Sequence, residues 1–307
     1  MSAARDYEDI RALATERVKQ SALRAVLVVP SETATLPAFM TAYRDGLIQP
    51  TIIGNESKLR RTAAEENIDL GDTKVIDIDQ PAMAIEAACK MTEAGDADII
   101  VQGRILREGL LRALAGSNVG FVPKGSTLSH VGVLKPGRYG RLLMVCDGLV
   151  HDEPDLKAKL ALIDNVAAVG TSLGLGKPRV AIVTAVEAIY PQMAATLDGA
   201  VLAKMAARGQ IKTAEVDGPL SFDIAIDPEA ARSKGIVDSP VAGQADAILA
   251  SARQVAAGIC QAMSLFAECE CGHVLVGGRG PVAFNFVGDS ERSRYNSILL
   301  AVLNCRR

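Results

Sequence analysis

The sequence contains no tryptophan, and aromatic residues fill only 4% of its 307 positions. A core of this chain must therefore be built from Ala, Val, Ile and Leu, which is typical of α/β proteins with buried parallel strands. Hydrophobic residues make up 49% of the chain and charged residues 22%, which is ample for a sizeable core. At this length we expect two domains or one large domain.

Several classes of protein lack their usual signals in this sequence. The net charge is −3 and no basic block occurs, so we expect no nucleic-acid partner. No apolar run reaches the roughly 18 residues that a membrane span needs, and the charged, helix-like N-terminus is not a signal peptide. Six scattered cysteines fit a reducing compartment better than a disulfide framework. We therefore expect a cytoplasmic protein that does not associate with membranes.

Glycine and cysteine motifs exclude two further kinds of site. The sequence has no P-loop, and Gly174-Leu175-Gly176 lacks the third glycine of a dinucleotide fingerprint, so we expect a helix C-cap there. The segment Cys269-Glu270-Cys271-Gly272-His273 resembles half of a metal site. A tetrahedral zinc needs a further ligand, and no Cys/His pair with suitable spacing supplies it. The sequence therefore predicts no metal.

Short aliphatic runs alternate with helical patterns along the whole chain, and this alternation predicts a mostly parallel sheet with right-handed crossovers. The expected strands are Ala25–Val29, Thr51–Ile53, Val75–Ile78, Asp98–Val101, His130–Leu134, Leu142–Cys146, Val180–Thr184, Phe222–Ile226, Ala247–Leu249 and Val274–Val276. The expected helices are Pro37–Asp45, Lys58–Glu66, Pro81–Ala94, Ala158–Leu173, Met193–Arg208, Asp227–Lys234, Ala245–Phe266 and Asp289–Cys305. The glycine-rich segment 116–140 breaks this rhythm and predicts a junction between domains.

Polar residues at expected strand ends are the first candidates for a site. Asp147 directly follows a strand, and Glu187 closely follows another. Because the carboxyl ends of parallel strands face the ligand crevice, we expect both carboxylates to be functional. Ser129 and His130 either donate hydrogen bonds to an acyl or phosphate oxygen or form a capped loop serine beside a half-buried histidine. A nucleophilic serine is not expected, because the sequence has no G-x-S-x-G elbow.

Two further places allow both a structural and a functional interpretation. Asp217, in Asp217-Gly218-Pro219, either caps its own backbone in a turn or presents a carboxylate at the edge of a cleft. Arg279, Arg292 and Arg294 surround the turn Gly288-Asp289-Ser290. A helix that begins there would offer free N–H groups to an anion, with arginines nearby. The alternative is a solvated first turn with incidental arginines.

These peptides resemble those of the phosphate acetyl/butyryl transferase family. The resemblance covers nearly the whole chain, is strongest over residues 120–245, and is closer to the butyryl branch than to the acetyl branch. It is carried by Leu128-Ser129-His130-Val131, Thr184-Ala185-Val186-Glu187, Pro191 with Met193, Thr196-Leu197-Asp198, Arg208-Gly209-Gln210, Asp217-Gly218-Pro219-Leu220 with Phe222-Asp223, Ser239-Pro240-Val241-Ala242-Gly243, Pro281-Val282 and Asp289-Ser290.

The resemblance implies two mostly parallel α/β domains with a cleft between them, related to the isocitrate/isopropylmalate dehydrogenase fold. One domain would comprise residues 1–137 and 286–307, and the other residues 138–285. The implied activity is reversible transfer of a short acyl group between coenzyme A and phosphate. Acyl-CoA and phosphate would be the partners, coenzyme A would be a substrate, and no cofactor would be tightly bound. The implied assembly is a homodimer or a larger homo-oligomer.

The reaction needs a deprotonated coenzyme A thiol, donors for an oxyanion and cationic partners for phosphate. We assign phosphate binding to Ser290, Arg294 and Arg279, and we place Glu187 among the substrate-binding residues. Ser129 and His130 would contact the oxygens of the acyl phosphate. Either Asp147 or Asp217 would orient the thiol or accept its proton.

The chain departs from the family pattern at residues that matter for this chemistry. Val287 stands where the family has an arginine, two residues before Asp289-Ser290, and Gln102 stands where it has a lysine. The family's Pro-Asp turn is not recognisable at 250–259. An alternative hypothesis is therefore a catalytically impaired relative that binds coenzyme A or acyl phosphate as a regulatory or partner subunit. A decarboxylating dehydrogenase is disfavoured, because clustered metal-binding aspartates and a nucleotide loop are missing.

Overall fold

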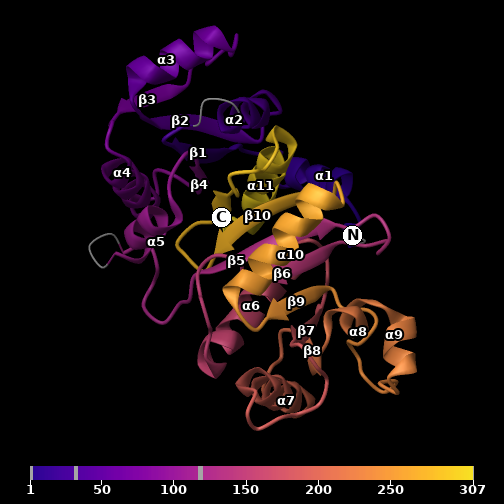
Figure 1. Ribbon diagram of the computed structural model, residues 1–307. Helices are drawn as coiled ribbons and strands as arrows, with labels where there is room; N and C mark the ends of the chain where they lie inside the picture. The colour runs from indigo at the N-terminus through magenta and orange to yellow at the C-terminus, as the bar shows by residue number, and fades with distance from the viewer. Residues whose placement is uncertain (1–2, 31–33, 117–119, 307) are drawn as a thin grey trace. The chain divides into compact units, whose positions relative to one another are not determined.

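The computed structural model describes residues 3–30, 34–116 and 120–306 (Figure 1). The chain divides into two compact units, and the strands within each unit are mostly parallel. Unit 1 comprises Met1–Asp6 and Ser129–Cys269, and unit 2 comprises Tyr7–Leu128 and Glu270–Arg307. The units divide after residues 128 and 269, whereas the resemblance implied domain boundaries after residues 137 and 285. The domain boundaries that the resemblance implied stay a prediction.

In unit 2 the strands follow the order β3-β2-β1-β4-β11-β10, and every neighbouring pair is parallel except β11 with β10. The strands are β1 (Leu23–Val28), β2 (Ile48–Gly54), β3 (Lys74–Asp77), β4 (Ile99–Gln102), β10 (Glu270–Val276) and β11 (Val282–Phe284). The helices are α1 (Tyr7–Arg17), α2 (Thr35–Arg44), α3 (Glu56–Glu65), α4 (Pro81–Ala94), α5 (Arg107–Ala115) and α11 (Glu291–Asn304).

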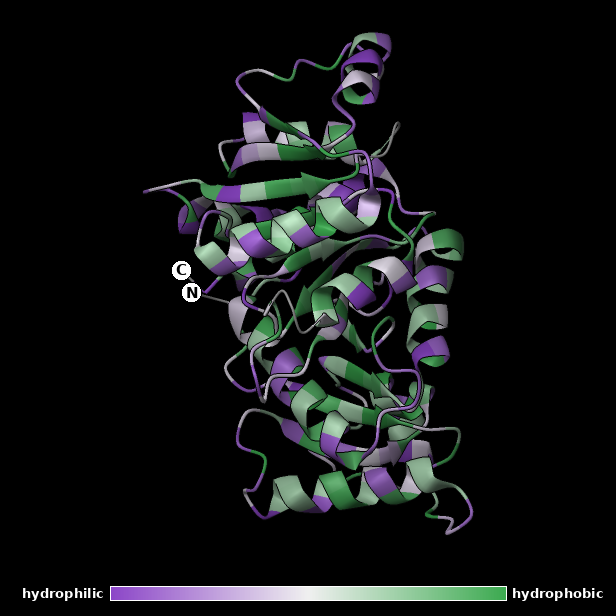
Figure 2. Ribbon diagram, turned by 90° about the vertical axis from the view of Figure 1, so that its left-hand side faces the viewer, coloured by the Kyte–Doolittle hydropathy of each residue, from purple (hydrophilic) through white to green (hydrophobic). Residues whose placement is uncertain are grey.

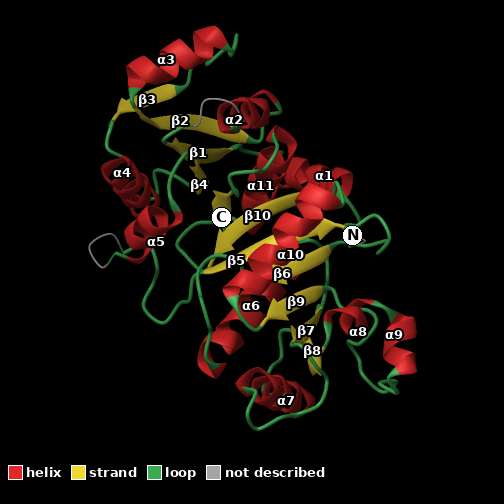
Figure 3. Cartoon of the chain, viewed as in Figure 1, coloured by secondary structure: helices red, strands yellow, loops and turns green. Residues whose placement is uncertain are grey.

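In unit 1 the strands follow the order β5-β6-β9-β7-β8, and every neighbouring pair is parallel except β5 with β6. The strands are β5 (Ser129–Lys135), β6 (Leu143–Cys146), β7 (Arg179–Val183), β8 (Glu215–Leu220) and β9 (Ala247–Ala250). The helices, visible in Figure 3, are α6 (Leu156–Ser172), α7 (Ala194–Ala207), α8 (Phe222–Ile226), α9 (Pro228–Ser233) and α10 (Arg253–Phe266).

The local sequence explains where most elements begin and end. Strands β4, β6 and β9 are buried at every position, as expected for short aliphatic runs in a parallel sheet. Figure 2 shows hydrophilic and hydrophobic colours alternating along the helices, the pattern of helices with one buried face. Asp155 is the N-cap of helix α6, and its side chain accepts a hydrogen bond from Ala158 N; the helix ends before Gly174, which has φ +87°. The predicted glycine C-cap is therefore confirmed.

Two element predictions are wrong. Phe222–Ile226, expected as a strand, is helix α8, and Asp217-Gly218-Pro219 lies inside β8 rather than before a strand. Five residues with alternating apolar positions are too few to separate a strand period from one helical turn. Ala245–Phe266 was expected as a helix, although Ala247–Leu249 within it was also expected as a strand. Strand β9 confirms the expected strand, and helix α10 begins only at Arg253. The sequence also gave no prediction of α5, β8 or β11.

One glycine has a clear steric reason in unit 2. A Cβ at Gly103 would lie 1.8 Å from the carbonyl oxygen of Val29, so only glycine lets the chain leaving β4 pass the end of β1 this closely. Residues 117–119 of the predicted junction segment lie outside the described residues. Among the described helices, none combines the length and apolar character that crossing a membrane would require.

Candidate functional site

The carboxyl edge of the sheet in unit 1 gathers three of the predicted site residues. Strand β6 ends at Cys146, so Asp147 is the first residue beyond it. Because β5 runs antiparallel to β6 and pairs Val131 with Cys146, the first residues of β5, Ser129 and His130, lie at the same edge. All three side chains are buried.

Asp147 is held by an unusually complete set of donors. Its Oδ1 accepts hydrogen bonds from the backbone N–H groups of His130, Leu149 and Val150 at 2.9–3.2 Å. Its Oδ2 accepts from His151 N at 3.3 Å and contacts the ring atom Nδ1 of His151 at 2.8 Å. Burial alone would raise the pKa of Asp147, but the hydrogen bonds from His151, Val150 and Leu149 lower it overall. The side chain is therefore a buried carboxylate at neutral pH.

His130 is neutral in this environment. Burial lowers the pKa of His130 to about 4, and the Asp147 carboxylate offsets part of that effect. The backbone N–H of Gly148 donates to Nδ1 of His130 at 3.1 Å, so the proton of the neutral ring lies on Nε2. A Cβ at Gly148 would lie 3.1 Å from this Nδ1 and 3.3 Å from Ala257 N. Glycine at position 148 therefore permits the close contact between the loop, His130 and α10.

Ser129 is fixed by helix α6. Asn165 Nδ2 donates to Ser129 Oγ at 2.8 Å, and the serine side chain is fully buried. This arrangement makes Ser129 a hydrogen-bonded member of the edge rather than an open nucleophile, in line with the missing nucleophile elbow. Its predicted contact with acyl-phosphate oxygens stays a prediction.

His151 is a candidate that the sequence reasoning missed. Since ionised Asp147 can only accept, Nδ1 of His151 donates to it, and the lone pair of a neutral imidazole then lies on Nε2. The side chain of His151 is 25% exposed, whereas that of Asp147 is 1% exposed. The signal was available, because His151 is one of three histidines and lies four residues after Asp147.

An apolar cavity of about 550 Å³ lies at the same edge, where β7 and β9 end. It is lined by residues from β7 and its following loop, by Phe222 of α8, and by the outer face of α10, among them Val183, Thr184, Val255, Ile259 and Met263. Val255 is 42% exposed although it is apolar. Such a surface suits an apolar part of a ligand.

Asp217 lies away from the end of its strand and joins two of the peptides that carry the family resemblance. Its Oδ1 accepts from Gly218 N at 2.8 Å, which is the backbone cap of the structural interpretation. Its Oδ2 accepts from the hydroxyl of Ser239, and Ser239 Oγ in turn accepts from Val241 N and Ala242 N. These contacts order the Ser239–Gly243 turn, while a catalytic role for Asp217 stays a prediction.

Glu187 follows β7, as expected from the sequence, and is engaged by neighbours within unit 1. Its Oε2 lies 3.0 Å from Lys234 Nζ. Hydrogen bonds from Ser221 and Lys234 lower the pKa of Glu187 below its ordinary value. These contacts tie the loop after β7 to α8 and α9, and substrate binding by Glu187 stays a prediction.

The turn before α11 in unit 2 holds two of the residues assigned to phosphate. Ser290 is the N-cap of α11, and its Oγ accepts from Ser293 N at 3.1 Å. The Arg294 guanidinium is buried and donates to the carbonyl oxygens of Phe286, Val287 and Asp289 and to Thr35 Oγ1, at 2.9–3.3 Å. Arg294 therefore clamps its own turn and offers little to an incoming anion.

Arg279, the third residue assigned to phosphate, is engaged elsewhere in unit 2. Its Nε donates to Gly120 O at 2.7 Å, and its NH2 group lies 3.6 Å from Glu93 Oε1. Arg292 pairs with Glu270 at 2.5 Å. Val287, which the resemblance aligns with an arginine of the family, is 100% exposed. None of these contacts joins Arg279 to Ser290 or to Arg294.

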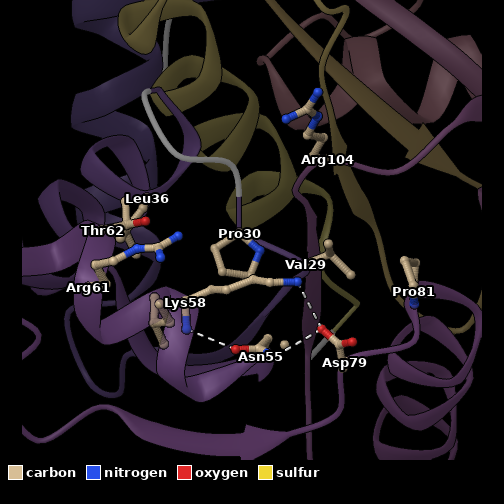
Figure 4. A pocket seen from close by; sticks show the side chains of 12 residues that line it. Val29, Pro30, Leu36, Asn55, Lys58, Arg61, Thr62, Asp79, Pro81 and Arg104 are labelled. Carbon is tan, nitrogen blue, oxygen red and sulfur yellow. Dashed lines mark hydrogen bonds and ion pairs between the residues drawn. The ribbon is translucent and has the colours of Figure 1, made fainter.

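Unit 2 has a cationic cavity of about 230 Å³ at the carboxyl ends of β1, β2 and β4 (Figure 4). Lys58, Arg61 and Arg104 line it, with Asp79 on the opposite side. Figure 4 shows Asn55 and Lys58 directed toward Asp79, at 3.0 and 3.3 Å. Three cations and one carboxylate make this cavity suited to a small anion. The sequence reasoning missed it, because Arg104 follows β4 whereas Lys58 and Arg61 lie on α3, and only folding brings these segments together.

The fold and the edge of unit 1 define an α/β protein with a polar carboxyl edge next to an apolar cavity. The model of the phosphate acetyl/butaryl transferase family matches residues 80–302. The chain belongs to the phosphate acetyl/butyryl transferase family, whose members are acyltransferases.

Curated relatives extend this match over almost the whole chain. A phosphate butyryltransferase of Clostridium beijerinckii is 34% identical over 292 residues, which cover 95% of this chain and 96% of the relative. A phosphate acetyltransferase of Rhizobium meliloti is 32% identical and covers 97% of this chain and 93% of the relative.

Among solved structures, a branched-chain phosphotransacylase from Enterococcus faecalis matches with a TM-score of 0.79 and 23% identity. It covers 93% of this chain and 100% of that chain. At this identity the match shows a shared fold.

Proposed function

We propose that this chain is a phosphate acyltransferase that transfers a short acyl group reversibly between coenzyme A and phosphate. The observation that carries the proposal is the arrangement at the carboxyl edge of unit 1 in a member of this family. There, a buried carboxylate at the end of β6 orients the imidazole of His151. The apolar cavity lies at the ends of the neighbouring strands β9 and β7.

In the proposed mechanism, His151 accepts the proton of the coenzyme A thiol. The thiolate is the nucleophile that attacks the acyl phosphate, so a base that removes the thiol proton accelerates the reaction. Asp147 positions the ring by accepting from Nδ1 and stabilises the imidazolium that forms, as a carboxylate does behind a catalytic histidine. In the reverse direction the same imidazolium returns the proton to the departing thiolate. Asp147 is thus a positioning residue.

The apolar cavity is proposed to bind the acyl chain and to favour butyryl over acetyl groups. Its lining is mostly apolar, with Thr184 and Ser251 as the polar residues. Each methylene group contributes only about 1–3 kcal/mol to discrimination, so several acyl groups should be accepted with graded rates. The predicted cleft between domains, the relation to the isocitrate dehydrogenase fold and the homo-oligomer stay predictions.

Release of free coenzyme A thiol from acetyl-, propionyl- and butyryl-CoA, with and without phosphate, tests this function. We expect phosphate-dependent release that is fastest with butyryl-CoA. Ala185→Leu narrows the cavity and should shift the preference toward acetyl-CoA, whereas Ala194→Leu, an exposed alanine outside the cavity, should not. Thiol release that is equal without phosphate, or absent from folded protein, would contradict the proposal.

A second candidate function is a coenzyme A-binding subunit without turnover. It is favoured by the exposed Val287 in the place of an arginine and by the four oxygen partners that occupy Arg294. Calorimetric titration with coenzyme A separates the two candidates. Binding without phosphate-dependent thiol release supports the subunit, and binding with release supports the enzyme.

A further inference from the structure

Three potential metal ligands from two segments of the sequence meet in unit 2. Cys271 and His273 are separated by one residue on β10, and Asp289 lies in the turn before α11. The donor atoms of the three side chains all lie within 4.8 Å of one another, and all three residues are buried. We propose that this cluster binds one divalent cation of the zinc class.

The geometry of the cluster is close to that of a bound ion. Three atoms no more than 4.8 Å apart can all lie within about 2.8 Å of one point, whereas zinc sits about 2.0–2.3 Å from nitrogen, oxygen and sulfur ligands. His273 Nε2 and Asp289 Oδ2 are already 3.8 Å apart. Side-chain movements of at most about 0.5–0.8 Å would therefore complete three coordination bonds.

The donor set determines the kind of ion. One thiolate, one imidazole and one carboxylate are the ligands of zinc and of its cobalt substitute, whereas magnesium and calcium prefer oxygen ligands alone. Cys271 must lose its proton when the ion binds, since the thiolate is the ligand. The hydroxyl of Ser293, 3.4 Å from Cys271 Sγ, or a water molecule would take the fourth position.

The surroundings hold the ligands in place. His273 N donates to Ser297 Oγ at 2.8 Å, and the rings of Phe284 and Phe286 pack edge-on against the imidazole, with centroids 6.5 and 4.9 Å away. Phe286 N donates to Asp289 Oδ2 at 2.7 Å. An apolar shell of this kind restricts water and strengthens coordination.

One neighbouring charge opposes the ion, and its contacts limit that effect. Arg294 lies beside Asp289, but its guanidinium is directed at three carbonyl oxygens and one hydroxyl. The thiolate and the carboxylate together carry two negative charges, which balance a divalent cation. The bound ion would fasten β10 to the turn that carries Ser290.

The test uses the full-length chain, stripped with a chelator under reducing conditions and reloaded with Co²⁺. We expect one cobalt per chain, visible d–d bands of a tetrahedral site and a near-ultraviolet band from thiolate-to-cobalt charge transfer. Binding of the ion should also raise the midpoint of thermal unfolding.

Variants assign the ligands. Cys271→Ala should abolish the charge-transfer band, and Asp289→Asn should weaken cobalt binding by at least about 10-fold, the effect of losing even an outer partner of a metal site. Cys269→Ala, the matched control in the same peptide, should retain the band.

The proposal is overturned if the wild-type chain takes up no stoichiometric cobalt or shows no thiolate band. It is equally overturned if Asp289→Asn binds cobalt as tightly as the wild type, or if Cys269→Ala rather than Cys271→Ala removes the band. Should Cys271→Ala fail to fold, the wild-type spectrum and the Asp289→Asn titration still decide.

Discussion

Two buried aspartates, one in each unit, have opposite electrostatic states. Asp147 is 3% exposed and Asp289 is 7% exposed, so their burial is nearly the same. Burial raises the pKa of Asp289 to about 6, which one backbone hydrogen bond from Phe286 and the charge of Arg294 offset only in part. Asp147 accepts five hydrogen bonds, and its pKa is lowered.

The comparison shows that burial alone does not set the charge of a carboxyl group. Donors that point at the carboxylate compensate for lost hydration, and backbone N–H groups do so without the conformational cost of long side chains. The loop from Asp147 to His151 is therefore built around a permanent negative charge. The turn around Asp289 carries its charge at an energetic cost.

Replacing Asp147 with asparagine should have the largest effect. Asparagine places an NH2 group where Asp147 Oδ2 accepts from the backbone and the ring of His151. These two buried donors then have no acceptor. The free energy of unfolding should fall by about 2–4 kcal/mol. Denaturant titration at pH 8 measures this free energy. If Asp147→Asn destabilised the protein less than Asp289→Asn, the contrast between the two carboxylates would be wrong.

His151→Gln tests whether the compensated carboxylate serves catalysis, given the proposed acyltransferase activity. Glutamine keeps a donor for Asp147 but cannot accept a proton, so kcat should fall by about 100-fold. Imidazole in the buffer should restore part of the rate. A variant that keeps the kcat of the wild type would exclude His151 as the base.

Asp289→Asn should stabilise the protein at pH 8, in contrast to the same change at Asp147. The folded protein binds the Asp289 proton more tightly than the unfolded chain does, so stability falls as pH rises from about 4 to about 6 and is level above that. A shift of roughly two units corresponds to at most about 3 kcal/mol.

The pH series must be run with a chelator, because Asp289 is also a proposed ligand. The gain from Asp289→Asn should shrink as pH falls from 6 to 4. His130 acts in the opposite direction in this window, since its pKa is lowered to about 4 and its contribution to stability is lost as pH falls from about 6.5. The difference between variant and wild type cancels that contribution. A difference that does not vary with pH would refute the assignment.

Val287→Arg should have the smallest effect. It tests whether the turn before α11 in unit 2 binds phosphate more tightly when an arginine is restored. The side chain at 287 is fully exposed, so arginine fits without displacing a neighbour. One charge-assisted hydrogen bond should lower the KM for phosphate by about 10-fold. Val237→Arg, at another exposed valine, is the matched control, and equal effects of both variants would indicate nonspecific attraction.

The sequence predicted the architecture well because its signals are local. Aliphatic runs, helical periodicity and a glycine C-cap each act within a few residues, and β1, α4, α6 and α11 lie where these signals placed them. The errors at α8 and at the start of α10 arose in short segments whose apolar spacing fits either period. Tertiary contacts decided between them.

The site was predictable in part for the same reason. Asp147 was found because a carboxylate directly after a parallel strand marks the carboxyl edge. The occupation of Arg294 was not predictable, since its partners Thr35 and Phe286 are brought to it by folding. Asp289 meets Cys271 and His273 for the same reason, so sequence spacing alone argued against a metal.

By itself, the sequence determined the α/β class, the order of most elements, the family and the position of Asp147 at a strand end. These depend on periodicity, composition and short peptides, which act over a few residues. Which polar groups are satisfied and which are charged depends on the fold. Hydrogen bonds compensate the burial of Asp147, the charge of Asp289 is energetically costly, and four oxygen atoms occupy the guanidinium of Arg294. Those properties depend on donors and acceptors contributed by distant segments, and only the folded chain brings such segments within the roughly 3 Å of a hydrogen bond.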